Sequence, residues 1–210
     1  MPAIKHTKNE LKAQREALRR FERFLPMLQL KKQQLQMEIQ SIDAAIAQKK
    51  ADEERVIQAL RPWLRMFADP FPIESLLSVE SVGQSESNIA GVTIPVFAGI
   101  FFKREPIDLF DSPPWIDEGL ETLEQLISLH TELDILAEQR RLIVEELRST
   151  SQRVNLFEKV KIPESREHIR IIKIFLGDEQ TAGVARAKNA KNRSSSRAAD
   201  IEPDPLERSA

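Results

Sequence analysis

The chain has 210 residues, of which 30% are charged and 6% aromatic, and its formal net charge is −2. So little aromatic bulk argues against a thick globular core and favours an elongated helical coiled coil. The absence of cysteine excludes disulfides and thiolate metal sites, and it is typical of a reducing compartment. No apolar run approaches the roughly 20 residues needed to cross a bilayer, and no signal-peptide pattern opens the chain. We therefore expect an intracellular protein that is not itself embedded in a membrane.

Residues 11–63 carry an almost unbroken heptad repeat of apolar side chains. With Leu11 at position a, twelve of the sixteen a and d positions are apolar. A spacing of 3.5 residues sustained over seven heptads predicts a narrow seam buried against a partner helix. The predicted seam residues on this helix are Leu18, Phe21, Leu25, Leu28, Leu35, Ile39, Ile42 and Ile46.

A second long helix is predicted from Ile116 onward, where apolar residues again recur at spacings of three and four. Beyond residue 154 the repeat resumes at Ile162, which fits an insertion that changes the supercoil locally without ending the helix. Two helices of roughly sixty residues would form an antiparallel hairpin about 90 Å long, with both termini at one end. The predicted seam residues on the second helix are Leu133, Val144, Leu147 and Val154.

The segment between the two helices has a different composition. Residues 62–115 contain seven of the twelve prolines, which a continuous helix would not tolerate. Alternating apolar residues on both sides of the polar stretch 83–88 predict a β-hairpin with a long loop, and Pro95 indicates an edge strand. This head is either a structural cap or a docking surface, and its apolar content favours docking. The candidate docking residues are Val92, Ile94, Val96, Phe101 and Phe102.

The predicted fold is therefore mainly α-helical, a long antiparallel two-helix coiled coil with a small β-hairpin head between the helices. The predicted domains are residues 1–66 for the first helix, 67–115 for the head and 116–190 for the second helix. Residues 191–210 contain almost no apolar side chain and are expected to be disordered.

Polar positions within the seam predict a register. If Trp63 lies near Leu120, then Glu53 lies beside His130, and a second complementary pair joins Lys49 to Asp134. Such pairs fix the register of coiled coils far more often than they bind ligands. The same register brings Pro26 and Pro163 within two helical turns of each other. Each proline removes one backbone hydrogen bond and bends its helix, so the two together predict either a functional bend or a tolerated kink.

The charges are distributed unevenly along the chain. Residues 1–32 hold nine Lys or Arg against three Glu, and residues 66–136 hold thirteen Asp or Glu against two Lys or Arg. Residues 161–193 are basic again. An antiparallel hairpin would therefore have one basic end and one acidic end, which indicates either two different partners or simply a solvated surface.

Three segments resemble one family, in family order along nearly the whole chain. They are residues 7–11 with 28–35, residues 88–95, and residues 153–155 continuing through 162–163 to Lys173. All three are similar to the D subunit of V-type (A-type) ATP synthases. The chain departs from the family pattern at Gln34, at residues 156–159 and at Gly177, which interrupts a normally continuous terminal helix.

The resemblance implies a central rotor shaft that turns and performs no bond chemistry. It implies partners as well: a hexameric catalytic head of A and B subunits, the F subunit on the flank, and the C subunit toward the membrane rotor. It also implies a cytoplasmic, peripheral location on the inner face of the membrane. Exposed ion pairs are weak and exchange easily, which suits a sliding contact with the hexamer. The basic residues expected to face the hexamer are Lys5, Lys8, Lys12, Arg166, Arg170 and Lys173.

No motif for catalysis, cofactor binding or metal binding is present in the sequence. The chain lacks a Gly-x-x-x-x-Gly-Lys phosphate loop and a His-x-x-x-His pair, and its three histidines lie far apart. We therefore expect no enzyme activity and no cofactor. A coiled-coil adaptor that dimerises through the seam and links two partners is the alternative, and a nucleic-acid-binding rod conflicts with the acidic end.

Overall fold

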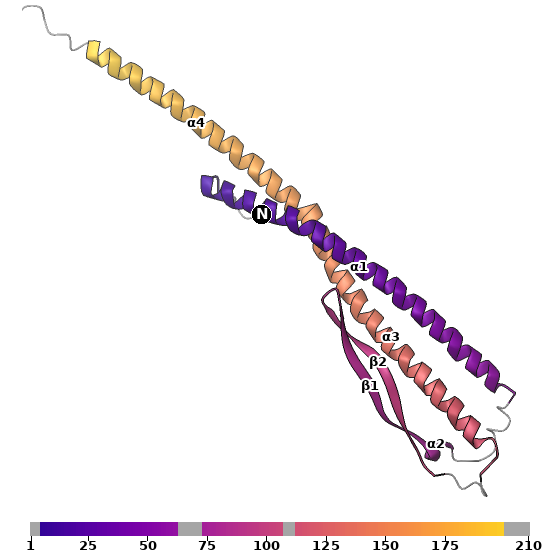
Figure 1. The fold of residues 1–210 in the computed structure, drawn as a ribbon. Helices are drawn as coiled ribbons and strands as arrows, with labels where there is room; N and C mark the ends of the chain where they lie inside the picture. The colour runs from indigo at the N-terminus through magenta and orange to yellow at the C-terminus, as the bar shows by residue number, and fades with distance from the viewer. Residues whose placement is uncertain (1–4, 63–72, 107–111, 200–210) are drawn as a thin grey trace, which may run out of the picture. The chain divides into compact units, whose positions relative to one another are not determined.

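The computed structural model describes residues 5–62, 73–106 and 112–199, and these are mainly helical with one β-hairpin (Figure 1). This confirms the predicted fold class. The chain divides into two compact units, Met27–Val154 and Met1–Pro26 with Asn155–Ala210. The elements in chain order are α1 (Lys8–Leu60), α2 (Ile73–Leu76), β1 (Leu77–Ile89), β2 (Val92–Arg104), α3 (Ile116–Leu156), the π-helix η2 (Phe157–Lys161) and α4 (Ile162–Ala199).

Helix α1 has clear start and stop signals. Its first turn is capped by Thr7, whose Oγ1 accepts a hydrogen bond of 3.2 Å from the backbone N–H of Glu10, in the Thr-x-x-Glu pattern typical of N-termini. At the other end, Pro62 follows directly after the last helical hydrogen bonds, which Arg61 donates. Trp63, which the heptad repeat includes, lies outside the described residues.

The core of unit Met27–Val154 joins three elements. Leu35 and Ile42 of α1, Ile94 of β2 and Ile143 of α3 form one buried cluster, and each is at most 5% exposed. The hairpin thus lies along the α1–α3 pair and shares its core (Figure 1). The predicted head is therefore packed against the coiled coil, because the apolar face of a two-stranded sheet is stable only when another element covers it.

The hairpin differs from the prediction in its loop. Strands β1 and β2 pair antiparallel from Leu77–Arg104 to Ile89–Val92, so the polar stretch 83–88 belongs to β1. The turn consists of only Ala90 and Gly91, whose φ angles of 51° and 83° are those of the tight turn that matches strand twist. The predicted long loop is therefore wrong. The stretch is polar because β1 is an edge strand whose side chains are mostly exposed.

The base of the hairpin packs on the start of α3. Leu77, Trp115, Ile116 and Leu120 form a second buried cluster in the same unit. Arg104 at the end of β2 adds a bidentate ion pair to Glu124 of α3, with N–O distances of 2.6 and 2.8 Å. This hydrogen bond lowers the pKa of the Glu124 carboxyl from its ordinary value. Both ends of the hairpin are thereby fixed to α3.

In the other unit, the predicted insertion is a π-helical turn. The backbone N–H of Ile162 bonds to the carbonyl of Phe157, five residues earlier, so one extra residue enters the helix. Pro163 follows at once; it has no N–H to donate, and its ring would crowd the carbonyl four residues earlier in a regular α-helix. The Phe157 ring lies 5.2 Å from that of Phe21 of α1.

Helix α4 is longer than predicted. It continues through Gly177 and past Lys191 to Ala199, whereas the predicted second helix ends at residue 190. In its first half Ile169 and Ile172 are buried and Arg166 pairs with Glu22 of α1, whereas nearly all side chains after residue 176 are exposed. Alanine and other good helix formers in 182–190 favour a helix even without tertiary packing. Residues 200–210 lie outside the described part.

Candidate interaction surfaces

The predicted seam residues of α1 are all at least partly buried. Leu35 and Ile42 are buried, and the other predicted seam residues on this helix are each partly buried. On α3, Leu133 and Val154 are buried and Leu147 is partly buried. Val144 does not fit the prediction: it is 38% exposed, and its neighbour Ile143 is fully buried instead.

The error at Val144 has a physical cause. Helix α3 contacts α1 on one side and the hairpin on another, so its buried surface is wider than one seam. Ile143 meets both neighbours in the common cluster, while Ile135 and Gln139 are buried outside the seam. When a third element covers the helix, heptad spacing alone cannot tell which of two adjacent β-branched residues, Ile143 or Val144, is buried.

Three ion pairs and one glutamate–histidine contact cross between α1 and α3. The predicted Glu53–His130 pair is confirmed, with 3.4 Å between Oε1 and Nδ1. Lys49 was expected beside Asp134, and this is wrong: its Nζ lies 2.7 Å from Oε2 of Glu132. Residues two apart on a helix point in nearly opposite directions, so the ammonium reaches only one of them. The two further pairs are Arg140–Asp43 and Lys31–Glu146, each with 2.6 Å between nitrogen and oxygen.

The candidate docking residues of the hairpin are not equivalent. Ile94 is only 2% exposed, so it is unavailable to a partner in this structure and its assignment as a docking residue is wrong. Val92 and Phe102 pack against the two clusters, and Val96 is partly buried. Phe101 is 64% exposed. The β2 side chains alternate between the helical core and solvent, as in any half-covered sheet.

One contact of the hairpin was not predicted. The Gln139 side chain, 7% exposed, donates a hydrogen bond of 2.5 Å from Nε2 to the backbone carbonyl of Pro95. A buried amide with this partner fixes the middle of β2 onto α3. A glutamine on a predicted helix gives no sign of such a role, because sequence does not reveal which strand will lie over it.

The basic candidate residues belong to the unit of Met1–Pro26 and Asn155–Ala210, and all six are exposed. Arg166 pairs with Glu22 of α1 at 2.9 Å, and Arg170 pairs with Glu167 at 2.6 Å. The Arg170 hydrogen bond lowers the pKa of the Glu167 carboxyl. These are open, solvated pairs, which exchange partners at little cost.

Neither a metal cluster nor a membrane helix emerges from the described part of the chain. No group of three or more His, Cys, Asp or Glu side chains there is arranged to hold a metal ion. None of the described helices combines the length and apolarity needed to span a membrane.

A family model and individual relatives identify the same family for this chain. The family described as the ATP synthase D subunit matches residues 10–192. The D subunit of a V-type ATP synthase from Borreliella burgdorferi is 46% identical over 192 residues, covering 91% of this chain and 95% of that protein. The V-type D subunits of Chlamydia caviae and Chlamydia muridarum are 31% and 33% identical. Each of these two alignments covers 90% of this chain, with 93% and 95% of the respective relative.

The family match includes the second and third segments on which the sequence resemblance rests, and all of the first segment except residues 7–9. It also extends over α1, the hairpin, α3 and most of α4, so it covers both units. Identity of 46% across nine-tenths of the chain is far above what a shared helical pattern alone produces. The chain belongs to the family of ATP synthase D subunits and is a component of a V-type ATP synthase complex.

Proposed function

We propose that this chain is the non-catalytic central rotor shaft of a V/A-type ATP synthase. In this role it transmits torque between a catalytic hexamer of A and B subunits and the ion-translocating rotor in the membrane. The F and C subunits are its further partners, and its place is cytoplasmic and peripheral to the membrane. The chain performs no bond chemistry, and nucleotide binding belongs to the partners.

One observation supports the shaft over other roles. The α1–α3 seam is filled by side chains of the same chain, with Leu35, Ile42 and Ile143 in one cluster. A helix pair that completes its own core can act as a rigid element in a single copy. A dimerising adaptor, the alternative, would leave its seam for a second chain.

A second observation agrees with a helix pair that transmits torque. The three ion pairs and the Glu53–His130 contact between α1 and α3 join residues about 80 to 115 positions apart and lie at successive levels of the pair. Individually such pairs are weak, about 0 to 1 kcal/mol. Together with the apolar seam they oppose sliding of one helix along the other, as torque transmission requires.

The test is rotation in a reconstituted complex. The chain contains no cysteine, so a Ser81→Cys variant carries a unique label on the exposed strand β1. Co-expression with the A, B and F subunits of the same genome, followed by single-molecule imaging, should show ATP-driven rotation of the label. A complex that hydrolyses ATP while the label stays still, or a chain that forms only a self-dimer, would contradict the proposal.

A further inference from the structure

The end of α4, residues 180–199 and called here the basic end, carries positive charge without any acid. Its sequence holds five Lys or Arg and no Asp or Glu. Every described side chain from 184 to 196 is exposed. The ion pairs of α4 among the described residues all lie before residue 171, so the cations of the basic end have no acidic partner in that part of the chain.

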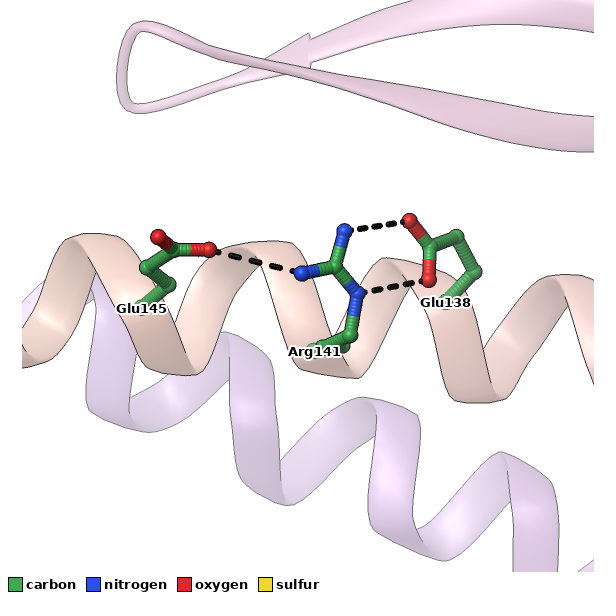
Figure 2. Close-up of polar contacts among 3 residues, drawn as sticks. All are labelled: Glu138, Arg141 and Glu145. Atoms are coloured by element: carbon green, nitrogen blue, oxygen red, sulfur yellow. Dashed lines mark hydrogen bonds and ion pairs between the residues drawn. The ribbon is translucent and has the colours of Figure 1, made fainter.

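Two other helix surfaces show how exposed cations are usually satisfied. On α3, Arg141 bridges Glu138 and Glu145 at 2.7 and 3.5 Å, as Figure 2 shows. In the first half of α4, Arg166 pairs with Glu22 of α1. Solvated helices normally mix both signs of charge in this way. The basic end lacks this balance, and its excess of positive charge attracts an acidic segment.

Two arginines share one side of the basic end. Arg186 and Arg193 are seven residues apart, which is two helical turns and about 10 Å along the axis. Between them lies a shallow depression lined by Arg186, Asn189, Ala190, Arg193 and Ser194. The small side chains there leave room for a chain segment, and each guanidinium group binds a carboxylate through two parallel hydrogen bonds.

An acidic segment follows α4 in the sequence. Residues 200–210, which lie outside the described part of the structure, contain four acids and one arginine: Asp200, Glu202, Asp204, Glu207 and Arg208. The family match ends at residue 192, so the segment is not among the residues that define the family. Its prolines, Pro203 and Pro205, favour an extended backbone over a helix.

The length of the segment matches the spacing of the arginines. An extended chain advances about 3.1 Å per residue and a helix about 1.5 Å, so a segment that turns back after Ala199 passes two helical residues with each of its own. With two residues used for the reversal, Asp204 stands about 9 Å back from the helix end and Glu207 about 19 Å. Arg193 and Arg186 lie about 9 and 20 Å before that end. The two carboxylates therefore reach the two guanidinium groups.

From these observations we propose that residues 200–210 fold back along α4 and occupy the depression, with Asp204 beside Arg193 and Glu207 beside Arg186. The segment thereby covers the basic end and competes for it with acidic side chains of the catalytic hexamer. The competition rests on the proposed function, in which basic residues of this unit face the hexamer. Each exposed pair is weak, but the tether raises the effective concentration of the segment, and a tighter partner still displaces it.

Carbodiimide crosslinking of the isolated chain tests the fold-back contact. The reagent joins a carboxylate directly to a neighbouring amine, so the variant Arg186→Lys/Arg193→Lys keeps the charge and makes both positions reactive. At low ionic strength we expect links from position 193 to Asp204 and from position 186 to Glu207, and their loss in high salt. The Lys49–Glu132 pair, with 2.7 Å between Nζ and Oε2, is the internal reference and should link in the same sample.

Three results of this experiment would overturn the fold-back contact. The first is the absence of links to Asp204 and Glu207 while the Lys49–Glu132 link forms. The second is an equal or larger yield of links from these two acids to Lys188 and Lys191, which lie on the opposite side of the helix. The third is a link between two chains, which a mixture of unlabelled and isotope-labelled protein reveals.

Binding to the A–B hexamer tests the competition. The variant Glu202→Gln/Asp204→Asn/Glu207→Gln keeps the full chain but removes the charge of the segment. We expect it to bind the hexamer about fivefold more tightly than wild type at low ionic strength, because the basic end is no longer covered. The difference should vanish in high salt.

The control for this variant makes the same change in net charge elsewhere. Glu54→Gln/Glu80→Gln/Glu86→Gln neutralises three exposed acids of the other unit and should bind the hexamer as wild type does. Equal gains for the two triple variants would show that only net charge matters and would overturn the competition. Unchanged binding by the variant of the segment would overturn it as well.

The outcomes separate this proposal from the rotor assignment. If the wild-type chain assembles and rotates while Asp204 and Glu207 form no links, the fold-back contact is overturned and the shaft stands. If the links form but the chain enters no hexamer, the shaft assignment fails together with the competition, and the fold-back contact stands.

Discussion

Lys31 and Glu146 lie 115 positions apart in the chain, yet the Nζ of one is 2.6 Å from the Oε1 of the other. The ion pair joins α1 to α3, and its ammonium lies 4.0 Å from where a Cβ on Gly91 would stand, at the tip of the hairpin. Both side chains are less than a third exposed. Three elements of the unit thus meet at one ion pair.

This pair makes stability depend on pH in the acid range. The hydrogen bond from Lys31 lowers the pKa of the Glu146 carboxyl below its usual 4.5. A carboxyl with a lowered pKa in the folded state stabilises the protein above its unfolded pKa, and this contribution is lost as the pH falls through the lowered value. We expect Lys31→Met to unfold more easily at pH 7, by about 1 kcal/mol, with a smaller difference from wild type near pH 3.

Urea denaturation at the two pH values measures this effect. The matched control is Arg141→Met in the exposed network of Figure 2, which should change the free energy of unfolding by less than about 0.5 kcal/mol. Equal losses for the two variants at pH 7 would show that the Lys31 pair contributes no more than a surface pair.

Ile143 and Val144 are adjacent β-branched residues with opposite environments. Ile143→Ala should destabilise the protein by about 2 to 5 kcal/mol, because it opens a cavity in the cluster that joins α1, α3 and β2. Val144→Ala should change stability by about 0.5 kcal/mol or less, since its side chain is 38% exposed. Thermal or urea unfolding of the pair checks the register of the seam, and a reversed order would place Val144 inside it.

Gln139 holds the hairpin on α3 through the carbonyl of Pro95. Gln139→Leu keeps the approximate volume but leaves this carbonyl without its partner, which costs about 1 to 3 kcal/mol. Hydrogen exchange should accelerate in β2 more than at the α1–α3 seam. Gln152→Leu, at an exposed position of α3, is the control and should leave exchange in β2 unchanged.

The hairpin turn contains a non-glycine residue with a positive φ, Ala90 at 51°. Ala90→Gly removes this backbone strain and should stabilise the protein by about 0.5 to 1 kcal/mol. Ala98→Gly in β2 is expected to destabilise the protein, because glycine there only adds conformational freedom to the unfolded chain. Melting temperatures of both variants decide the matter, and destabilisation by Ala90→Gly would contradict the strained turn.

The basic surface should affect assembly in a salt-dependent way. Replacing Arg166, Arg170 and Lys173 by Gln should weaken binding to an A–B hexamer by about tenfold at low ionic strength, and by less in high salt. The control replaces Arg55, Arg141 and Arg148, which changes the net charge equally but in the other unit. Titration of fluorescently labelled chain into the hexamer measures both, and equal losses would show that only the net charge matters.

The two long helices, the start of the second at Ile116 and the family could all be predicted from the amino-acid sequence. Heptad spacing at residues such as Leu35 and Ile42 is a local signal, repeated many times, so single irregularities do not hide it. The Glu53–His130 pair also followed from the sequence, because an antiparallel register relates residues by a constant sum once one contact is known.

Only the tertiary fold decides which residues are buried where the hairpin packs on the helix pair. The hairpin folds back over α3, buries Ile94 and Ile143 and makes Gln139 a buried donor. Periodicity describes a helix with one partner, and it fails where two neighbours widen the buried surface. The two-residue turn at Ala90 and Gly91 could not be predicted for a related reason. The polar residues before it belong to β1, and not to a loop, only because β2 supplies their hydrogen bonds.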